Sequence, residues 1–278
     1  MKKLFDEVAF KTSKITTREY STSFSLGIRL FKPKFRQPIY NIYGFVRFAD
    51  EIVDTFHDYD KSSLFHRFRE DTWMAITDGI SMNPILHSFQ ETARKYSIGN
   101  ELIEAFLDSM EMDLQNFSHS RESFNKYVLG SAEVVGLMCL HVFCEGNMAL
   151  HEQLKPYAMR LGAAYQKINF LRDMQADYLE MGRKYFPGLR IENFNDGQKE
   201  IIEKEIEEDF RLGYQGIKML PAGAKFGVYI SYIYYYSLFK KIRKTRPEQV
   251  LTSRIRISNF TKYLLLMRSW FVYKLNLL

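Results

Sequence analysis

Apolar residues recur at intervals of three and four positions through much of the chain, which is the period of an α-helix with one buried face. Four long segments show this pattern, namely residues 39–55, 101–117, 122–147 and 153–181. Turn signals separate the periodic segments at Lys32-Pro33, Gln37-Pro38, Asn83-Pro84, Gly99-Asn100, Phe186-Pro187-Gly188, Asn195-Asp196-Gly197 and Arg246-Pro247. The pattern predicts long helices joined by turns, and therefore an all-α fold.

The composition fits one globular domain that spans residues 1–278. Hydrophobic residues make up 46% of the chain, and only 7 prolines and 15 glycines leave little room for flexible linkers. Aromatic residues reach 15%, many of them tyrosines, and a plain core needs fewer polar-tipped rings. A large cavity with aromatic walls would explain this share.

The charge and the cysteines exclude several classes of function. The formal net charge of +6 fits nucleic acid, an acidic membrane surface or an anionic substrate. The basic residues are densest between positions 240 and 256, but no recognised nucleic-acid motif accompanies them, so we expect no nucleic-acid partner. Cys139 and Cys144 are five positions apart and would point away from each other on a helix, which argues against a disulfide or a zinc site.

The ends of the chain predict a cytoplasmic protein. The N-terminal residues reach Asp6 and Glu7 before any apolar stretch of signal-peptide length, and the apolar run from Leu264 to Met267 is closed by Arg268. We find no apolar run of membrane-spanning length. The tail nevertheless combines apolar residues with Arg268 and Lys274. Such a helix could lie in a membrane interface, and it could equally dock on the bundle.

Two acidic motifs carry the candidate chemistry. Asp50 and Asp54 are four positions apart, so on a helix both carboxylates lie on one face, and Asn169, Asp173 and Asp177 repeat this spacing. The flanking residues are apolar, which predicts that both groups face the interior of the bundle. Carboxylate oxygens suit magnesium, which binds one or two acids and completes its shell with water and substrate phosphates.

A simpler interpretation is that Arg47 and Arg172 pair with these acids in exposed salt bridges. A single Asp-x-x-x-Asp pattern would favour that interpretation, because such pairs commonly support surface helices. Two copies of the pattern, each preceded by arginine and set in an apolar helix, favour a metal site instead.

These motifs resemble those of the squalene and phytoene synthase family, Arg-x-x-Asp-Asp-x-x-Asp and Asn-x-x-Arg-Asp-x-x-x-Asp. The resemblance covers nearly the whole chain. It includes Ser21-Thr22-Ser23-Phe24, the segment Tyr127 to Gly136, Gly182-Arg183-Lys184-Tyr185-Phe186-Pro187, and a C-terminal segment from Arg254 to Lys262 that is most typical of phytoene synthases. Glu51 stands where the family usually has a second Asp, and Gln175-Ala176 replaces a segment that often carries another acid.

The resemblance implies a single all-α, isoprenoid-synthase-type helical bundle around a central cavity, in which both motifs face each other and bind Mg²⁺, with Mn²⁺ as an alternative. The implied metal site consists of Asp50, Asp54, Asn169, Asp173 and Asp177. The implied catalytic residues are Tyr43, Arg47, Tyr127, Arg172 and Tyr235. The implied substrate-binding residues are Ser21, Ser23, Gln166, Arg254 and Lys262. Arginine and lysine would contact the diphosphates, and the tyrosines would lie near the reacting carbons.

The implied activity is a prenyltransferase reaction that joins two prenyl diphosphates head to head through a cyclopropyl diphosphate intermediate. Two geranylgeranyl diphosphates giving phytoene, a step of carotenoid biosynthesis, is the first expectation. Dehydrosqualene or squalene from farnesyl diphosphate is the second, and NADPH is expected only if the product is squalene. A head-to-tail prenyltransferase, a terpene cyclase and a non-catalytic assembly or scaffold protein of the same fold remain alternatives.

The cationic tail segment makes a separate geometric prediction. Arg254 and Lys262 are eight positions apart, close to two helical turns, so in a helix they would share a face and both reach a diphosphate. Arg256 would then point sideways.

Overall fold

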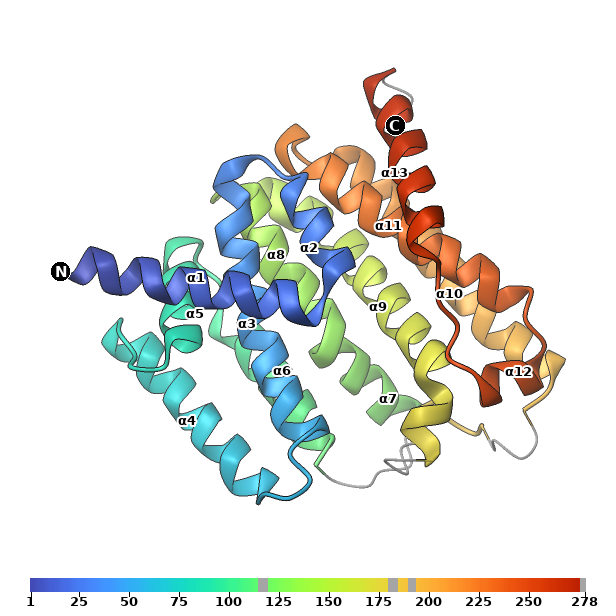
Figure 1. The fold of residues 1–278 in the computed structure, drawn as a ribbon, viewed down its shortest axis with the longest axis horizontal. Helices are drawn as coiled ribbons and strands as arrows, with labels where there is room; N and C mark the ends of the chain where they lie inside the picture. The colour runs from blue at the N-terminus through green and yellow to red at the C-terminus, as the bar shows by residue number, and fades with distance from the viewer. Residues whose placement is uncertain (115–119, 180–184, 190–193, 276–278) are drawn as a thin grey trace.

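The computed structural model describes residues 1–114, 120–179, 185–189 and 194–275, with the backbone alone of residues 176–179. Helices account for about four fifths of these residues, and the described residues contain no β-strand. The all-α prediction is therefore confirmed. In Figure 1 helices α4 and α5 lie on the left, α10 to α13 on the right, and α8 and α9 between them.

The N-terminal part of the bundle consists of six helices. They are α1 (Lys2–Tyr20), α2 (Thr22–Arg29), α3 (Pro33–Asp54), α4 (Lys61–Asp78), α5 (Pro84–Lys95) and α6 (Asn100–Met112). Helix α3 packs against α1 and α5, and also against α8 from the middle of the chain. The first acidic motif therefore lies on a helix that is packed against other helices on several sides.

The second part of the chain starts with a nearly continuous helical segment formed by α7, η1 and α8. The elements of this part are α7 (Arg121–Val128), the π-helical turn η1 (Leu129–Glu133), α8 (Val134–Cys144), α9 (Met148–Leu179), α10 (Asp196–Met219), α11 (Ala222–Arg243), α12 (Pro247–Thr252) and α13 (Asn259–Lys274). Helix α9 packs against η1 and α8 and also against α10, so the second acidic motif lies on a central helix.

Local sequence explains most helix starts. The side chains of Ser21, Asp60, Asn83, Ser120, Asn195 and Ser258 accept hydrogen bonds from backbone N–H groups in the first turns of α2, α4, α5, α7, α10 and α13. This N-cap satisfies donors that have no partner within the helix. The prolines at positions 33, 84 and 247 open α3, α5 and α12, where their fixed φ suits the first turn.

The predicted break at Gln37-Pro38 is wrong, because Pro38 lies inside α3. A proline at this position removes only the hydrogen bond to the carbonyl of Lys34, near the start of the helix, and the Pro38 ring is buried in the bundle. The Gln37 side chain also ties this turn to α1, since its Nε2 donates to the Phe10 carbonyl over 2.8 Å. Tertiary packing therefore outweighs the local signal.

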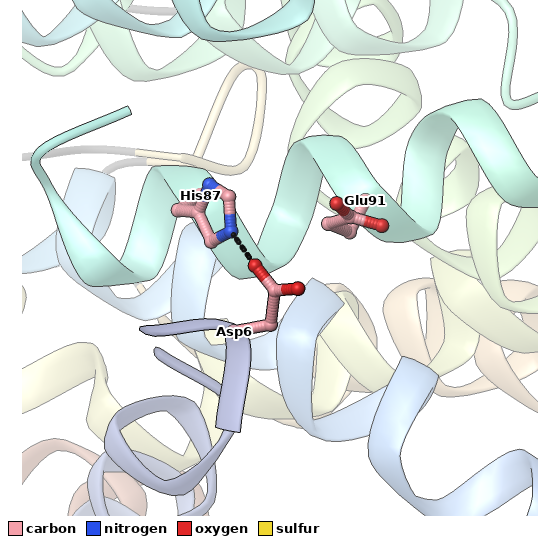
Figure 2. A group of neighbouring side chains, drawn as sticks. All are labelled: Asp6, His87 and Glu91. Atoms are coloured by element: carbon pink, nitrogen blue, oxygen red, sulfur yellow. Dashed lines mark hydrogen bonds and ion pairs between the residues drawn. The ribbon is translucent and has the colours of Figure 1, made fainter. Parts of the chain in front are cut away.

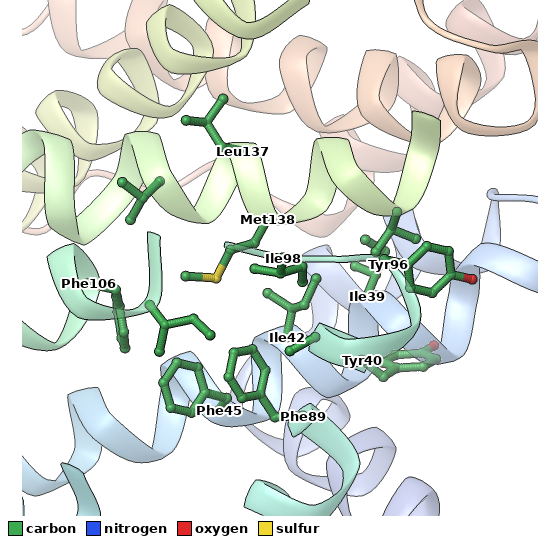
Figure 3. Packing of buried hydrophobic residues seen from close by; sticks show 14 of the residues in the cluster. Ile39, Tyr40, Ile42, Phe45, Phe89, Tyr96, Ile98, Phe106, Leu137 and Met138 are labelled. Atoms are coloured by element: carbon green, nitrogen blue, oxygen red, sulfur yellow. The ribbon is translucent and has the colours of Figure 1, made fainter. Parts of the chain in front are cut away.

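Two clusters of buried apolar side chains form the core. The first joins α3, α5, α6 and α8, and Figure 3 shows Ile42, Phe45, Phe89, Phe106 and Met138 meeting between these helices. The Phe45 and Phe89 rings stack with their centroids 3.9 Å apart. The second cluster joins α7, α9, α10, α11 and α12. Each acidic motif is thus carried by a helix that belongs to a different cluster.

One helical segment among the described residues, Arg121–Cys144, is long and apolar enough to cross a membrane by length and composition, contrary to the expectation from sequence. Its most apolar window is 61% buried within the bundle. The core helix of a soluble protein passes the same test, and Leu137 and Met138 of this segment are part of the first apolar cluster.

Candidate active site

The first acidic motif occupies the last turns of α3. Tyr43, Arg47, Asp50 and Asp54 follow one another along one face, and the Arg47 guanidinium pairs with both Asp50 and Glu51. The same guanidinium lies 4.5 Å from the centroid of the Tyr20 ring, so α1 holds it from the other side. Glu51, which departs from the family pattern, is therefore a partner of Arg47, and it also lines a surface cavity between α3 and α4.

A carboxylate that sequence analysis missed joins this motif. Burial raises the pKa of Asp50 to about 7, with contributions from the neighbouring Asp54, Asp113 and Glu51, although Arg47 opposes this. Asp113 follows α6 directly and accepts a hydrogen bond of 2.6 Å from the Tyr127 hydroxyl. It belongs to no repeated spacing, and only the packing of α6 against α3 brings it to the motif.

The second motif follows one face of α9 as a chain of hydrogen bonds. Gln166 Nε2 donates to Ser131 Oγ over 3.2 Å, and Asn169 Nδ2 donates to Gln166 Oε1 over 3.4 Å. Arg172 Nη2 pairs with Asp173 Oδ2 at 2.5 Å. The backbone of Asp177 lies in the last turn of α9, but its side chain is outside the described residues, so its predicted role stays a prediction.

Tyrosines connect the two motifs. The Tyr235 hydroxyl on α11 donates to Asn169 Oδ1 over 3.3 Å and also hydrogen-bonds with Arg172. Burial raises the pKa of Tyr43 to about 12, and Asp50 and Tyr235 lie close enough to add to this effect. The α3 and α9 motifs therefore share one region, as predicted.

The predicted N-terminal serines border the same region. Ser21 caps α2 and forms a side-chain hydrogen bond with Tyr43, whose ring stacks on Phe24 with a centroid distance of 4.9 Å. Ser23 Oγ accepts a hydrogen bond of 2.7 Å from Lys262 Nζ at the start of α13. Burial lowers the pKa of Lys262, as expected for an ammonium group held between α2 and α13.

The C-terminal cations reach the site by a route that differs from the helical prediction. Residues 254–258 have no helical structure, because α12 ends at Thr252 and α13 begins only at Asn259. The extended segment buries Ile255 and brings Arg254 Nε to 2.7 Å from Asp173 Oδ1. Arg256 is exposed, and its carbonyl accepts a hydrogen bond from Lys241.

The arginines pair with the motif acids, as the simpler interpretation expects, but these groups are only partly exposed and converge from several helices. The two motifs also differ in charge. Asp54, Asp113 and Glu51 lie close to Asp50, which pairs with Arg47, whereas Asp173 pairs with Arg172 and Arg254. Clustered hard oxygens around Asp50, whose pKa is raised, fit a site for magnesium, because a cation would relieve the repulsion.

Tyr127 has an apolar environment beside the first motif. Its side chain is buried, and its ring lies 5.8 Å from Phe170 and 5.4 Å from Tyr185, measured between centroids. Tyr235 stacks on Tyr165 at 4.1 Å. Both tyrosines thus present a hydroxyl to the polar groups and an aromatic body to the second apolar cluster. The lysine and arginine of the Gly182-Arg183-Lys184 motif lie outside the described residues.

A separate group of potential metal ligands lies on α1 and α5. Figure 2 shows Asp6 pointing to His87, with Glu91 one turn further along α5. His87 Nε2 lies 2.9 Å from Asp6 Oδ1, and Lys2 Nζ lies 3.0 Å from Asp6 and 3.2 Å from Glu91. The Lys2 ammonium thus already supplies a cation, and the group acts as an ion-pair network that ties α1 to α5.

Comparisons with known proteins agree with this arrangement. The family model described as squalene/phytoene synthase matches residues 17–261. The chain is 26% identical to the 4,4'-diapophytoene synthase of Staphylococcus haemolyticus over 68% of this chain and 65% of that protein. It is also 26% identical to the chloroplastic phytoene synthase 3 of Zea mays over 74% of this chain and 49% of that protein.

The matched segments thus span about half to two thirds of these relatives. Among solved structures, a dehydrosqualene synthase superposes with a TM-score of 0.80 at 17% identity, covering 97% of this chain and 98% of that one. A squalene synthase from Alicyclobacillus acidocaldarius gives 0.74 at 19% identity, covering 86% and 94%. The likeness to these structures supports the fold, and the family model decides the family. The chain belongs to the squalene/phytoene synthase family.

Proposed function

We propose that the protein is a prenyltransferase that condenses two geranylgeranyl diphosphates head to head to phytoene through a cyclopropyl diphosphate intermediate. The observation that carries this proposal is the convergence of both acidic motifs with Arg254 and Lys262 in one region joined by Tyr43 and Tyr235. Two diphosphate groups need positive charge from more than one side. Arg172 on α9, Arg254 before α13 and Lys262 would supply it directly, and the α3 carboxylates would supply it through bound metal.

Metal ions have candidate ligands in both motifs. Asp50, Asp54 and Asp113 would hold Mg²⁺ or Mn²⁺ on the α3 side, and Asn169 with Asp173 on the α9 side. The bound metal would neutralise the negative charge that develops on the departing diphosphate.

The cationic side chains would bind the diphosphates directly. Arg172 and Arg254 now share Asp173, and a diphosphate carries more negative charge than one carboxylate. We infer that the two guanidinium groups exchange Asp173 for phosphate oxygens, to which arginine can donate two parallel hydrogen bonds. Lys262, positioned by Ser23, would contribute a further point charge.

Aromatic side chains would protect the allylic cation that remains after the diphosphate leaves. The stacked pairs Tyr43–Phe24 and Tyr165–Tyr235 lie next to the polar groups, so the prenyl carbons would meet ring faces. Ring faces stabilise cationic charge and exclude water, which would otherwise capture the cation as an alcohol. The second prenyl double bond would then attack the cation to close the cyclopropane ring.

Dehydrosqualene or squalene from farnesyl diphosphate is the second candidate. The 4,4'-diapophytoene synthase relative and the dehydrosqualene synthase structure favour it, whereas the phytoene synthase relative favours the longer substrate. A non-catalytic scaffold role has less support, because the described carboxylates of both motifs converge.

Mass analysis of the product tests the proposal. The protein would be incubated with geranylgeranyl or farnesyl diphosphate and Mg²⁺, with and without NADPH. We expect phytoene from geranylgeranyl diphosphate, with no requirement for NADPH. Squalene or dehydrosqualene as the only product would favour the second candidate, a cyclic hydrocarbon made from one substrate molecule would indicate a cyclase, and no product would favour the scaffold role.

A further inference from the structure

The outer face of α13 exposes a row of large apolar side chains. They recur at intervals of three and four positions, so they form one stripe along the helix. The members of this stripe, exposed by 40–71%, are Phe260, Tyr263, Leu264, Met267, Trp270, Phe271 and Leu275. A contiguous apolar surface of this kind commonly marks a site of interaction.

The opposite face of α13 is firmly attached to α11. Ser269 is buried, and the Tyr273 ring lies 4.8 Å from Phe226 between centroids. The Tyr234 hydroxyl donates to the Lys262 carbonyl over 2.9 Å at the other end of the helix. The apolar stripe is therefore displayed on a helix that is held in place at both ends.

The charged residues of α13 and of the segment before it have one sign. After Glu248 the sequence contains no aspartate or glutamate, but it contains five basic residues, namely Arg254, Arg256, Lys262, Arg268 and Lys274. Arg268 and Lys274 are exposed on α13 itself, and Lys274 Nζ lies 5.8 Å from the centroid of the Trp270 ring. A second copy of this helix would bring these positive charges together, whereas an anionic surface would neutralise them.

We propose that α13 docks on the surface of an anionic lipid bilayer, with its apolar stripe in the boundary between headgroups and acyl chains. An amphipathic helix with cationic flanks and interfacial aromatic residues has this preference. Each basic residue near an anionic surface contributes about 1 kcal/mol, so Arg268 and Lys274 together favour anionic over neutral lipid by roughly tenfold or more.

The docking surface is continuous with the candidate active site. Lys262 lies in the first turn of α13 and donates to Ser23 beside the motifs, and Arg254 precedes the same helix. Docking would therefore hold the site next to the bilayer, in which hydrophobic prenyl chains dissolve. This consequence for substrate delivery rests on the proposed function, but the docking itself does not.

Trp270 allows a direct test, because the chain has only 2 tryptophans, Trp73 and Trp270. Trp73→Phe leaves Trp270 as the only indole. Its emission and its quenching by acrylamide would be recorded with vesicles of phosphatidylcholine alone or mixed with phosphatidylglycerol. We expect a blue shift, protection from acrylamide and roughly tenfold stronger flotation with the anionic vesicles, weaker at high salt.

Two matched double variants identify the surface. The double variant Leu264→Ser with Phe271→Ser should no longer float with anionic vesicles. The double variant Val8→Ser with Ile15→Ser should still float, because these α1 residues are similarly exposed but lie among charges of both signs. Unchanged Trp270 emission with both vesicles would overturn the proposal. So would equal loss in both double variants, or a blue shift that depends on protein concentration and not on lipid, which would indicate a second copy. None of these measurements depends on catalytic activity. A negative result would therefore overturn membrane docking without bearing on the proposed function.

Discussion

Individual side chains in the candidate site show a division of charge. Asp50 pairs with Arg47 and lies close to Asp54, Asp113 and Glu51, and its pKa is raised to about 7 by burial and by these carboxylates. Asp173 lies between Arg172 and Arg254. The α3 side is therefore suited to recruit cations, and the α9 side already contains the cations that a diphosphate requires.

The carboxylates of both motifs should be essential for activity. Asp50→Ala or Asp173→Ala should abolish turnover, and Asp113→Asn should lower it by at least about tenfold, the factor that corresponds to roughly 1.4 kcal/mol. Steady-state kinetics with Mg²⁺ would measure this, and circular dichroism would check the fold. Near-normal activity in well-folded Asp50→Ala or Asp173→Ala protein would remove the metal assignment.

The C-terminal cations should differ in their effect. A charge-assisted contact to phosphate contributes about 1.5 to 3 kcal/mol, so Arg254→Ala should lower turnover by about tenfold to a hundredfold. Lys262→Ala should have a smaller effect, and Arg256→Ala the smallest, because the Arg254 side chain contacts Asp173, whereas Arg256 contacts Lys241 through its backbone carbonyl. Kinetic sensitivity at Arg256 alone would show that the wrong arginine has been assigned to the site.

Glu133 offers a test of stability that is independent of catalysis. Burial raises its pKa to about 7 from an ordinary value of 4.5, although Arg160 opposes this. Between these pH values the folded state binds more protons than the unfolded state, so this group lowers the stability as the pH rises through 7. Glu133→Gln should therefore raise the free energy of unfolding by about 1 to 3 kcal/mol at pH 8 and by less at pH 5.

Urea denaturation at both pH values would measure the effect. The control is Glu208→Gln, which removes an exposed carboxylate whose pKa is lowered by its hydrogen bond to Arg211. It should not gain stability at pH 8. An equal gain in both variants would mean that the effect arises from net charge and not from the burial of Glu133.

At the scale of the helices, the sequence predicted what depends on local spacing. The four periodic segments became α3, α6, the α7–η1–α8 segment and α9, and the acids at four-residue spacing lie on α3 and α9 as expected. The errors arose where tertiary contacts decide. Packing keeps Pro38 inside α3, burial of Ile255 extends residues 254–258, and only the approach of α6 to α3 adds Asp113 to the site.

The close approach of η1 to α6 should be sensitive to a single methyl group. A Cβ at Gly130 would clash with the Ala105 carbonyl and the Ser109 side chain, and the backbone of α6 cannot rotate away. Gly130→Ala should therefore lower the free energy of unfolding by about 1 to 3 kcal/mol, despite the better helix propensity of alanine. Gly27→Ala, on helix α2, is the control, because its Cβ would lie 3.7 Å from the Gly227 carbonyl oxygen, an ordinary van der Waals contact. Equal midpoints of urea unfolding in both variants would contradict the packing.

In the molecule as a whole, the candidate site lies where the two apolar clusters meet. Motif residues on α3 belong with the first cluster and those on α9 with the second, while Val228 on α11 packs against both. Tyr43 and Tyr235 connect the motifs across this junction. A ligand that bridges the motifs would therefore join the two clusters and stabilise the folded state.

Inorganic diphosphate with Mg²⁺ should stabilise the protein more than either component alone. A ligand at a hundredfold excess over its Kd adds about 2.7 kcal/mol, which for a chain of this size corresponds to a rise in Tm of about 5 to 10 °C. Differential scanning fluorimetry at constant ionic strength would measure the shift. Asp50→Ala should keep its own Tm without ligand, because relief of the repulsion from neighbouring carboxylates offsets the lost ion pair with Arg47, but it should lose the shift. An equal shift with diphosphate alone, or a full shift in Asp50→Ala, would mean that arginines bind the anion without help from the metal, and the α3 carboxylates would then need another role.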